Sequence, residues 1–224
     1  MWLQLCRIVL VAAFGLAAPA RAQVASDGVR KLADIAYGAA PRQVLDVYLP
    51  PPGRALKGGA PILLMVHGGA WMFGDKSNPG VVVAKVAHWC ESGWIFVSVN
   101  NRLHPEAAPL EQAADVARAL AFVQQRAAAW GGDPGRIVLM GHSAGAHLVA
   151  LLDASPSLAT AAGAGRWSAS VVLDSAATDL EALMMRRHAR FYDSVFGSEP
   201  QLWQRASPLA QLSAAAPPLL LVCS

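Results

Sequence analysis

The chain has 224 residues, of which 54% are hydrophobic and 15% are charged, and its formal net charge is +3 at pH 7. This length suits one domain with a substantial core, and the high apolar content argues against intrinsic disorder. The lysines and arginines form no dense cluster, which argues against a nucleic-acid-binding surface.

The N-terminus predicts a secretory signal peptide. Arg7 precedes an apolar run at residues 8–18, and a small-x-small pattern follows at residues 20–22. The run is shorter than the ~20 residues that span a bilayer, so a membrane anchor is the less favoured interpretation. We therefore expect residues 1–22 to be removed, leaving a secreted or periplasmic domain at 23–224 with no membrane attachment.

Two cysteines, Cys90 and Cys223, remain in that mature chain. An oxidising compartment would allow them to pair, provided that the fold brings their Cβ atoms close together. The sequence leaves open both a disulfide and two free thiols.

Short strands then alternate with helical stretches. Apolar or alternating runs predict strands at 43–50, 61–69, 94–103, 136–143, 168–176 and 217–224. Most of these runs are continuously apolar, which is typical of strands buried on both faces. Leu110, Ala113, Ala117 and Leu120 recur at helical spacing and predict a helix before the glycines at 131–132. The pattern indicates the α/β class, with a mostly parallel sheet covered by helices on both faces.

Two glycine-rich motifs follow predicted strands. They are HGGAW at residues 67–71, here called the HGGAW loop, and GHSAG at residues 141–145. In open α/β sheets, ligands bind where the carboxyl ends of the strands meet their loops. We therefore expect both motifs to lie at one edge of the sheet.

Ser143 stands at the centre of the GHSAG motif, which fits the G-x-S-x-G pattern. A strand that turns sharply into a helix strains the central residue and brings the flanking backbone very close, so the neighbours must be small. The turn exposes the serine hydroxyl beside the amides of a helix N-terminus, which attract negative charge. This context predicts a nucleophilic serine.

The HGGAW loop can supply the complementary part of such a site. Ester or amide hydrolysis places negative charge on the carbonyl oxygen, and one fixed N–H donor there is worth a factor of ~10²–10³ in rate. A glycine-rich loop offers bare backbone amides for this purpose, together with the amide of Ala144.

These motifs, with "PPLLLV" near residue 220, resemble the α/β-hydrolase superfamily. Within it, the chain is similar to the esterase branch with an HGGxW or HGGG loop, which includes hormone-sensitive-lipase-like carboxylesterases and kynurenine-formamidase-like enzymes. The resemblance extends over residues 44–224. It implies that Ser143 is the nucleophile and that the amides of Gly69, Ala70 and Ala144 form the oxyanion hole.

Two features depart from that branch. Asn101 stands where the family often has tyrosine before Arg-Leu, and little chain precedes the HGGAW loop to build a large N-terminal cap. Both departures favour the small members of the group, whose sites are open.

A serine nucleophile also needs a base, which an acid orients. In this superfamily the acid and then the histidine come after the serine in the chain. By the resemblance, both follow the strand at 217–224. We therefore expect a hydrolase fold without its C-terminal part, with the acid and the base beyond Ser224.

Residues inside the chain are weaker candidates for these roles. Asp174 or Asp179 could serve as the acid, and His188 could serve as the base, although it stands among three arginines. His147 lies four residues after the serine on a predicted helix, where a packing or capping role is expected.

The sequence thus predicts a serine carboxylesterase that cleaves small esters through an acyl-enzyme on Ser143. No cofactor is needed, and the chain lacks H-E-x-x-H and paired-cysteine patterns, so no metal site is expected. Two alternatives stay open. One is a non-catalytic hydrolase fold that only binds a ligand or partner, and the other is an arylformamidase-type amide hydrolase. Acyl preference and oligomeric state are not determined by the sequence.

Overall fold

A computed structural model describes residues 22–24, 28–54, 56–175 and 177–223. Residues 1–21 of the predicted signal peptide lie outside this part. No helix among the described residues is long and apolar enough to cross a membrane.

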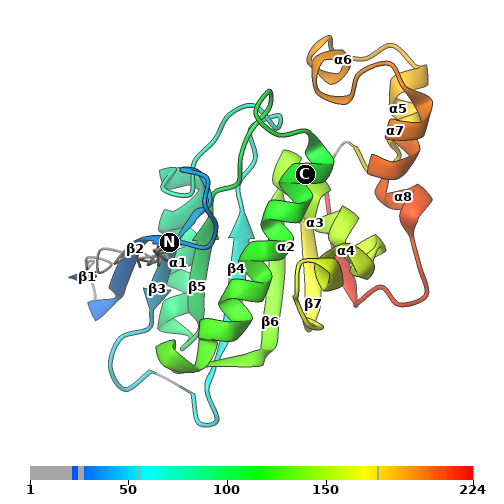
Figure 1. The fold of residues 1–224 in the computed structure, drawn as a ribbon. Coiled ribbons are helices and arrows are strands. Elements are labelled where there is room, and N and C mark those ends of the chain that lie inside the picture. The colour runs from blue at the N-terminus through cyan, green and yellow to red at the C-terminus, as the bar shows by residue number, and fades with distance from the viewer. Residues whose placement is uncertain (1–21, 25–27, 55, 176, 224) are drawn as a thin grey trace, which may run out of the picture.

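The fold is built on one eight-stranded sheet (Figure 1). In their order across the sheet, the strands are β1 (Ala22–Val24), β2 (Arg30–Ala36), β3 (Val44–Leu49), β5 (Ile95–Val99), β4 (Ala60–Val66), β6 (Gly132–His142), β7 (Ala169–Leu173) and β8 (Leu219–Val222). The five strands from β5 to β8 are mutually parallel, whereas β1, β2 and β3 are joined to them by antiparallel pairs.

All six predicted strands form, and two further strands, β1 and β2, were not predicted. Of these two strands, the structure describes the side chains of β2 only. All of its side chains are exposed or half-buried, so the strand lacks the continuous apolar run that marks the buried strands. The prediction of a mostly parallel α/β sheet is confirmed.

Helices cover both faces of the sheet. They are α1 (Pro79–Glu91), α2 (Pro109–Arg126), α3 (Ala144–Ala154), α4 (Pro156–Ala161), α5 (Leu180–Met185), α6 (Phe191–Phe196), α7 (Pro200–Ala206) and α8 (Pro208–Gln211), with a 3₁₀ turn, η2 (Ala127–Trp130), after α2. The predicted helix corresponds to α2, and Gly131, in the left-handed conformation, follows η2.

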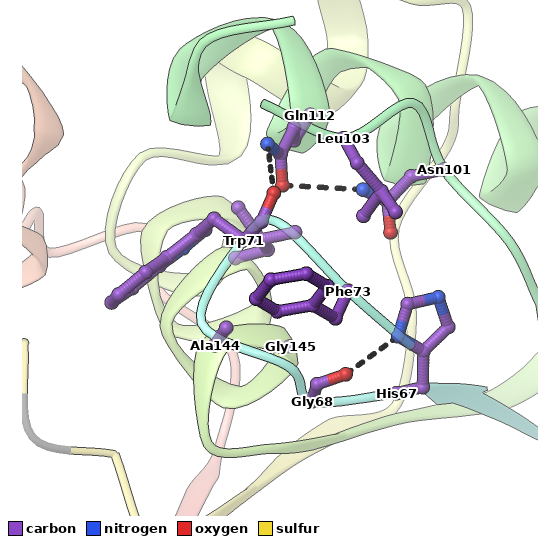
Figure 2. A pocket seen from close by; sticks show the side chains of 10 residues that line it. His67, Gly68, Trp71, Phe73, Asn101, Leu103, Gln112, Ala144 and Gly145 are labelled. Carbon is purple, nitrogen blue, oxygen red and sulfur yellow. Dashed lines mark hydrogen bonds between the residues drawn. The ribbon is translucent and has the colours of Figure 1, made fainter. Parts of the chain in front are cut away.

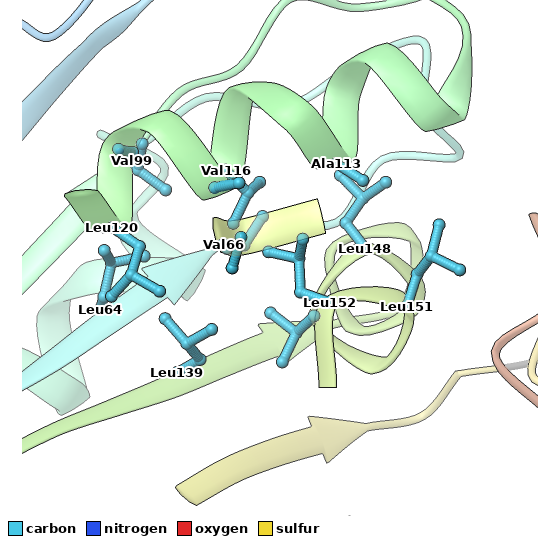
Figure 3. Packing of buried hydrophobic residues seen from close by; sticks show 14 of the residues in the cluster. Leu64, Val66, Val99, Ala113, Val116, Leu120, Leu139, Leu148, Leu151 and Leu152 are labelled. Atoms are coloured by element: carbon cyan, nitrogen blue, oxygen red, sulfur yellow. The ribbon is translucent and has the colours of Figure 1, made fainter. Parts of the chain in front are cut away.

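Alternation along β4 divides the core into two layers. Ile62, Leu64 and Val66 pack against α2 and α3, whereas Leu63 and Met65 face the layer under α1. Figure 3 shows the first layer, in which Leu64, Val66 and Leu139 from the sheet meet leucine, valine and alanine side chains from the two helices. All residues of β4 are buried, so this strand fixes the centre of the fold.

The helices α5 to α8, residues 180–211, form a group between β7 and β8 that we call the helical insertion (orange to red in Figure 1). The Leu209 amide donates to the Thr178 carbonyl at 2.9 Å, and the Ser213 amide donates to the Ala154 carbonyl at 3.1 Å. These bonds tie the helical insertion to the end of β7 and to α3.

Cys90 and Cys223 are free thiols, the first buried and the second exposed. Of the two states that the sequence left open, the structure therefore shows the unpaired one.

Candidate active site

Ser143 occupies a sharp turn between β6 and α3. Its backbone angles, φ 53° and ψ −116°, are rare for a residue with a Cβ. The Ser143 amide donates to the Leu173 carbonyl on β7 at 2.8 Å, and the Ser143 carbonyl accepts from the His147 amide at 3.1 Å. Strained backbone of this kind persists only where neighbouring elements hold it, and such positions concentrate at functional sites.

Small residues let the turn approach its neighbours. A Cβ on Gly145 would lie 2.4 Å from the carbonyl oxygens of both Val66 and His67, so only glycine lets α3 start this close to β4. A Cβ on Gly68 would lie 3.1 Å from the Ser143 Cβ. The HGGAW loop therefore lies directly against the serine.

The two motifs share an open pocket of about 600 Å³. Its lining includes Gly68, Gly69, Ala70, His142 and Ser143 from the motifs, and Phe73, Asn78 and Val81 from the segment that follows the HGGAW loop. Because Val66 is in register with Gly141, β4 and β6 end side by side and deliver both motifs to the same edge. Both motifs therefore lie at one edge of the sheet, as expected from the binding of ligands at the carboxyl ends of strands in α/β sheets.

The HGGAW loop presents free backbone donors. The Gly69 carbonyl accepts from the amides of Met72 and Phe73 at 3.0 and 2.9 Å, which closes a tight turn. Within the part of the chain that the structure describes, the Gly69 and Ala70 amides donate no hydrogen bond. The amide of Ala144 begins α3. The amides of Gly69, Ala70 and Ala144 are the three donors that, by the family resemblance, form the oxyanion hole.

Trp71, the last residue of the HGGAW loop, is fixed by contacts with other parts of the chain. Both Ala70 and Trp71 have positive φ, 52° and 61°. The Trp71 carbonyl accepts from Gln112 Nε2 at 3.0 Å and from the His104 amide at 2.8 Å. Figure 2 shows Gln112 reaching this carbonyl over a tightly packed pocket of only about 10 Å³. Contacts from other elements thus maintain an otherwise unfavourable backbone.

A buried ionic cluster anchors the segment after the HGGAW loop. Lys76 Nζ donates to Asp46 Oδ1 at 2.7 Å and to Asp34 Oδ1 at 2.8 Å, and Lys31 Nζ lies 2.8 Å from Asp46 Oδ2. Burial alone would raise the pKa of Asp46, but the hydrogen bonds from Lys31 and Lys76 hold it below its usual value. Asp46 therefore stays ionised and fixes Lys76 to β3.

Asp75 is held beside this cluster. Burial opposes its ionisation, yet hydrogen bonds from Ser77 and Asn100 lower the pKa of Asp75 to about 2. Asn100 Nδ2 donates to Asp75 at 2.7 Å, and Arg42 donates to the Gly74 carbonyl at 2.9 Å. Sequence reasoning did not single out these polar residues. The one visible signal was a charged Asp46 inside a strand whose other residues are apolar.

Asp174, the first acid candidate, lies near the serine. It follows β7 with φ 55°, and its amide donates to the Val222 carbonyl at 2.8 Å. Its Oδ2 lies 3.9 Å from Nε2 of His142, the residue before the nucleophile. This carboxylate is therefore at the correct edge of the sheet, one strand away from Ser143.

The other two candidates have local partners. Asp179 Oδ1 accepts from the Ala182 amide at 3.1 Å and caps α5. His188 Nε2 bonds to Asp193 Oδ1 at 2.9 Å, and its Nδ1 bonds to the Arg186 carbonyl at 2.7 Å. The hydrogen bond to Asp193 and then that to Arg186 raise the pKa of His188. Both ring nitrogens of His188 are thus occupied away from Ser143.

The remaining histidines near the site have structural contacts. His67 Nδ1 bonds to the Gly68 carbonyl at 2.8 Å, and burial lowers the pKa of this ring (Figure 2). His147 is fully buried, with ring partners on Trp71 and Ala206. Across the described ranges, no imidazole forms a hydrogen bond with the Ser143 side chain, and no group of three potential metal ligands occurs.

Solved structures with a similar fold include esterases. The fold is similar to a truncated form of a carbohydrate esterase from gut microbiota, with a TM-score of 0.74 and 21% identity over 89% of this chain and 78% of that one. It is also similar to Esterase B from Lactobacillus Rhamnosis, with a TM-score of 0.71 and 21% identity over 87% of this chain and 65% of that one. At these identities the likeness shows the fold.

Sequence relatives include Esterase LipQ of Mycobacterium tuberculosis, which is 33% identical over 205 residues, or 84% of this chain and 47% of that protein. A probable isoprenylcysteine alpha-carbonyl methylesterase, ICMEL2 of Arabidopsis thaliana, is 39% identical over 51% of this chain and 26% of its own length. The chain thus spans at most about half the length of these relatives. The pattern of the BD-FAE family matches residues 45–224, which include both motifs and the helical insertion. The chain therefore belongs to the BD-FAE family of α/β-hydrolase-fold proteins.

Proposed function

We propose that this chain carries the nucleophile and the oxyanion site of a serine carboxylesterase. The observation that carries the proposal is the position of the strained Ser143 against a loop whose Gly69 and Ala70 amides are free. A small-residue turn that only packed a helix on a sheet would have no need of unpaired donors beside a half-buried serine. The names of the relatives, among them a probable carboxylic ester hydrolase, LipM, support the same class of reaction.

The chemistry follows from the geometry. The Ser143 oxygen attacks the acyl carbon of the ester, and the former carbonyl oxygen becomes an oxyanion that the three amides stabilise. Collapse of this intermediate expels the alcohol and leaves an acyl-enzyme on Ser143. Water then attacks the acyl carbon, which releases the carboxylic acid and the free serine.

Both steps need a base that accepts a proton from the attacking hydroxyl or water. We propose that an imidazole, oriented by an acid, performs this role. His188 is poorly placed for the role because both of its ring nitrogens are engaged elsewhere. Asp174, at the end of β7, stays the best-placed internal carboxylate.

We propose small carboxylic esters as the substrate class. The pocket around Ser143 is open, and Phe73 stands at its rim with 67% of its surface exposed. A small ester can reach the serine through this opening. Chain-length and alcohol preferences depend on loop shapes that neither motif determines.

The test is labelling with a fluorophosphonate, which reacts with activated serines. The expected result is one labelled site that disappears in Ser143→Ala, while a Ser155→Ala control at the far end of α3 labels normally. If a folded protein as long as the relatives takes no label, the non-catalytic alternative is favoured. Hydrolysis of a short-chain nitrophenyl ester by the same preparations gives the second readout.

We further propose that the protein is exported. Arg7, the apolar run at 8–18 and the small residues at 20–22 support this proposal. Expression of residues 1–224 in a bacterial host should yield a mature protein whose mass corresponds to a start at Gln23. Recovery of the uncleaved chain from the cytoplasm would contradict it.

A further inference from the structure

His147 links three parts of the molecule. It lies on α3, one turn after Ser143, and none of its surface is exposed. Its Nδ1 accepts a hydrogen bond from Trp71 Nε1 at 3.2 Å, and its Nε2 donates to the Ala206 carbonyl at 2.7 Å. Since an indole N–H can only donate and a carbonyl can only accept, the tautomer with hydrogen on Nε2 is required.

The two ends of this chain of hydrogen bonds have different functions. Trp71 closes the HGGAW loop and directly follows Ala70, whose amide is one of the proposed oxyanion donors. Ala206 is the last residue of α7, within the helical insertion. His147 therefore connects the proposed oxyanion site to an insertion that folds back onto α3 from 59 residues further along the chain.

Aromatic packing follows the same path. The Trp71 ring meets Phe196 of α6 edge-on, with centroids 4.8 Å apart and planes at 79°. The His147 ring also meets Phe196 edge-on, with ring centroids 5.6 Å apart. The ring centroids of Tyr192 and Trp71 are 5.9 Å apart. Edge-to-face pairs in this distance range are favourable contacts. The helical insertion thus contacts the HGGAW loop directly, as well as through His147.

The strain in the HGGAW loop gives these contacts a consequence. Residues with a Cβ rarely adopt a positive φ, and they persist there only where surrounding structure holds them. Gln112 and His104 hold the Trp71 carbonyl, whereas His147 holds its indole. The anchor through His147 continues to the helical insertion at Ala206, and His104 reaches the same insertion where its Nε2 lies 3.5 Å from Ser194 Oγ.

We propose that His147 is a positioning residue that couples the docking of the helical insertion to the placement of the Gly69 and Ala70 amides. This inference rests on the proposed function, because those amides matter for a reaction only if they bind an oxyanion. Loosening the link displaces the donors while leaving the substrate pocket open. The rate of the chemical step then falls more than the affinity for substrate.

Three substitutions separate the parts of the link. His147→Phe keeps a ring but removes both hydrogen bonds. His147→Asn keeps an acceptor near the position of Nδ1, so it can retain the bond from Trp71. His147→Gln keeps a donor near the position of Nε2, so it can retain the bond to Ala206. Trp89→Phe, on α1 at the other face of the sheet, is the matched aromatic control.

The test uses the full-length protein and two readouts. Amide hydrogen exchange of Met72 and Phe73, which donate to the Gly69 carbonyl, reports the loop without any need for activity, as does the NMR signal of the Trp71 indole N–H. The rate of fluorophosphonate labelling of Ser143 reports the oxyanion site. We expect His147→Phe to accelerate exchange at residues 72 and 73 and to slow labelling about 10- to 100-fold, with an unchanged KM for a short-chain ester. The Asn and Gln variants should show intermediate effects, and Trp89→Phe should show none.

The outcomes distinguish the two proposals. Unchanged exchange at residues 72 and 73 in His147→Phe, or in the Asn and Gln variants if the phenylalanine variant does not fold, overturns the positioning role. Faster exchange in the variants, together with a wild-type protein that takes no label, retains the link to the loop and rejects the catalytic function. Equal losses in labelling and in substrate affinity would assign His147 to general packing.

Discussion

Lys76 Nζ lies 2.7 Å from Asp46 Oδ1 and thereby fixes the segment after the HGGAW loop to β3. The Asp46 side chain is completely buried, and its second oxygen lies 2.8 Å from Lys31. A buried carboxylate that loses one of its cations keeps much of its desolvation cost without the compensating attraction. The pair is therefore more important for the native loop than its position far from Ser143 suggests.

The first prediction concerns this pair. Lys76→Met should lower the free energy of unfolding by about 3 kcal/mol, because it leaves Asp46 buried with one cation in place of two. Urea denaturation at pH 7 measures the loss. Asp34→Asn is the matched control, since Asp34 contacts the same ammonium from a position that is 75% exposed. Its loss should stay below about 1 kcal/mol, and equal losses in the two variants would contradict the argument.

A second prediction concerns the close approach of α3 to β4. In Gly145→Ala the new Cβ would meet two backbone oxygens at 2.4 Å, and backbone cannot move aside as a flexible side chain can. We expect a destabilisation of about 3 kcal/mol or more, together with slower labelling of Ser143. Gly165→Ala, whose Cβ would meet only the Gln124 side chain at 3.7 Å, should leave stability nearly unchanged.

A third prediction concerns Asp153 on α3. This carboxyl is 1% exposed, and neither of its oxygens has a hydrogen-bond partner in the described part of the chain. Burial raises the pKa of Asp153, and the nearby Ser170 hydroxyl only partly opposes the rise. A raised pKa means that the folded state keeps its proton longer than the unfolded state. Stability is therefore lost as pH rises from about 4 through the folded-state pKa.

Asp153→Asn removes this titration, so the variant should gain stability relative to wild type as pH rises from 4 to 7. Urea midpoints at pH 4 and pH 7 test it. Asp133→Asn provides a control of opposite sign, because hydrogen bonds from Gly135 and Arg136 lower the pKa of that exposed carboxyl. A variant at 153 that is equally destabilised at both pH values would disprove the prediction.

The fourth prediction uses the buried imidazole. Burial lowers the pKa of His147 from 6.5 to about 4, although the Ala206 carbonyl partly opposes this shift. The unfolded chain therefore binds a proton first as pH falls, and stability is lost between pH 6.5 and about 4. Over this range wild type should lose about 3 kcal/mol more than His147→Gln. Parallel pH profiles for the two proteins would contradict a neutral His147 in the fold.

The fold could be predicted to a large extent because its main signals are local. Continuous apolar runs such as β4 and β6 mark strands buried on both faces, and the glycines around Ser143 mark the sharp turn that follows. The strand β2 was missed because its burial is partial. The order of the strands in the sheet depends on contacts between distant segments, so no single segment of sequence predicts it.

The site was predictable only as far as its motifs extend. Asp179 and His188 were candidates by residue type, yet short-range contacts with Ala182 and Asp193 occupy them. The contacts that hold the HGGAW loop come from Gln112, His147 and Lys76, which are distant from one another in sequence. Such pairings depend on the assembled fold, and a single sequence carries no direct signal for them.

The placement of β4 also has a consequence for synthesis on the ribosome. Its two neighbours, β5 and β6, both come later in the chain, and all of its residues are buried once the sheet is complete. Until residue 142 has emerged, a nascent chain therefore exposes an apolar strand with at least one edge unpaired. Such segments are aggregation-prone, so we expect chaperones to bind this strand during translation.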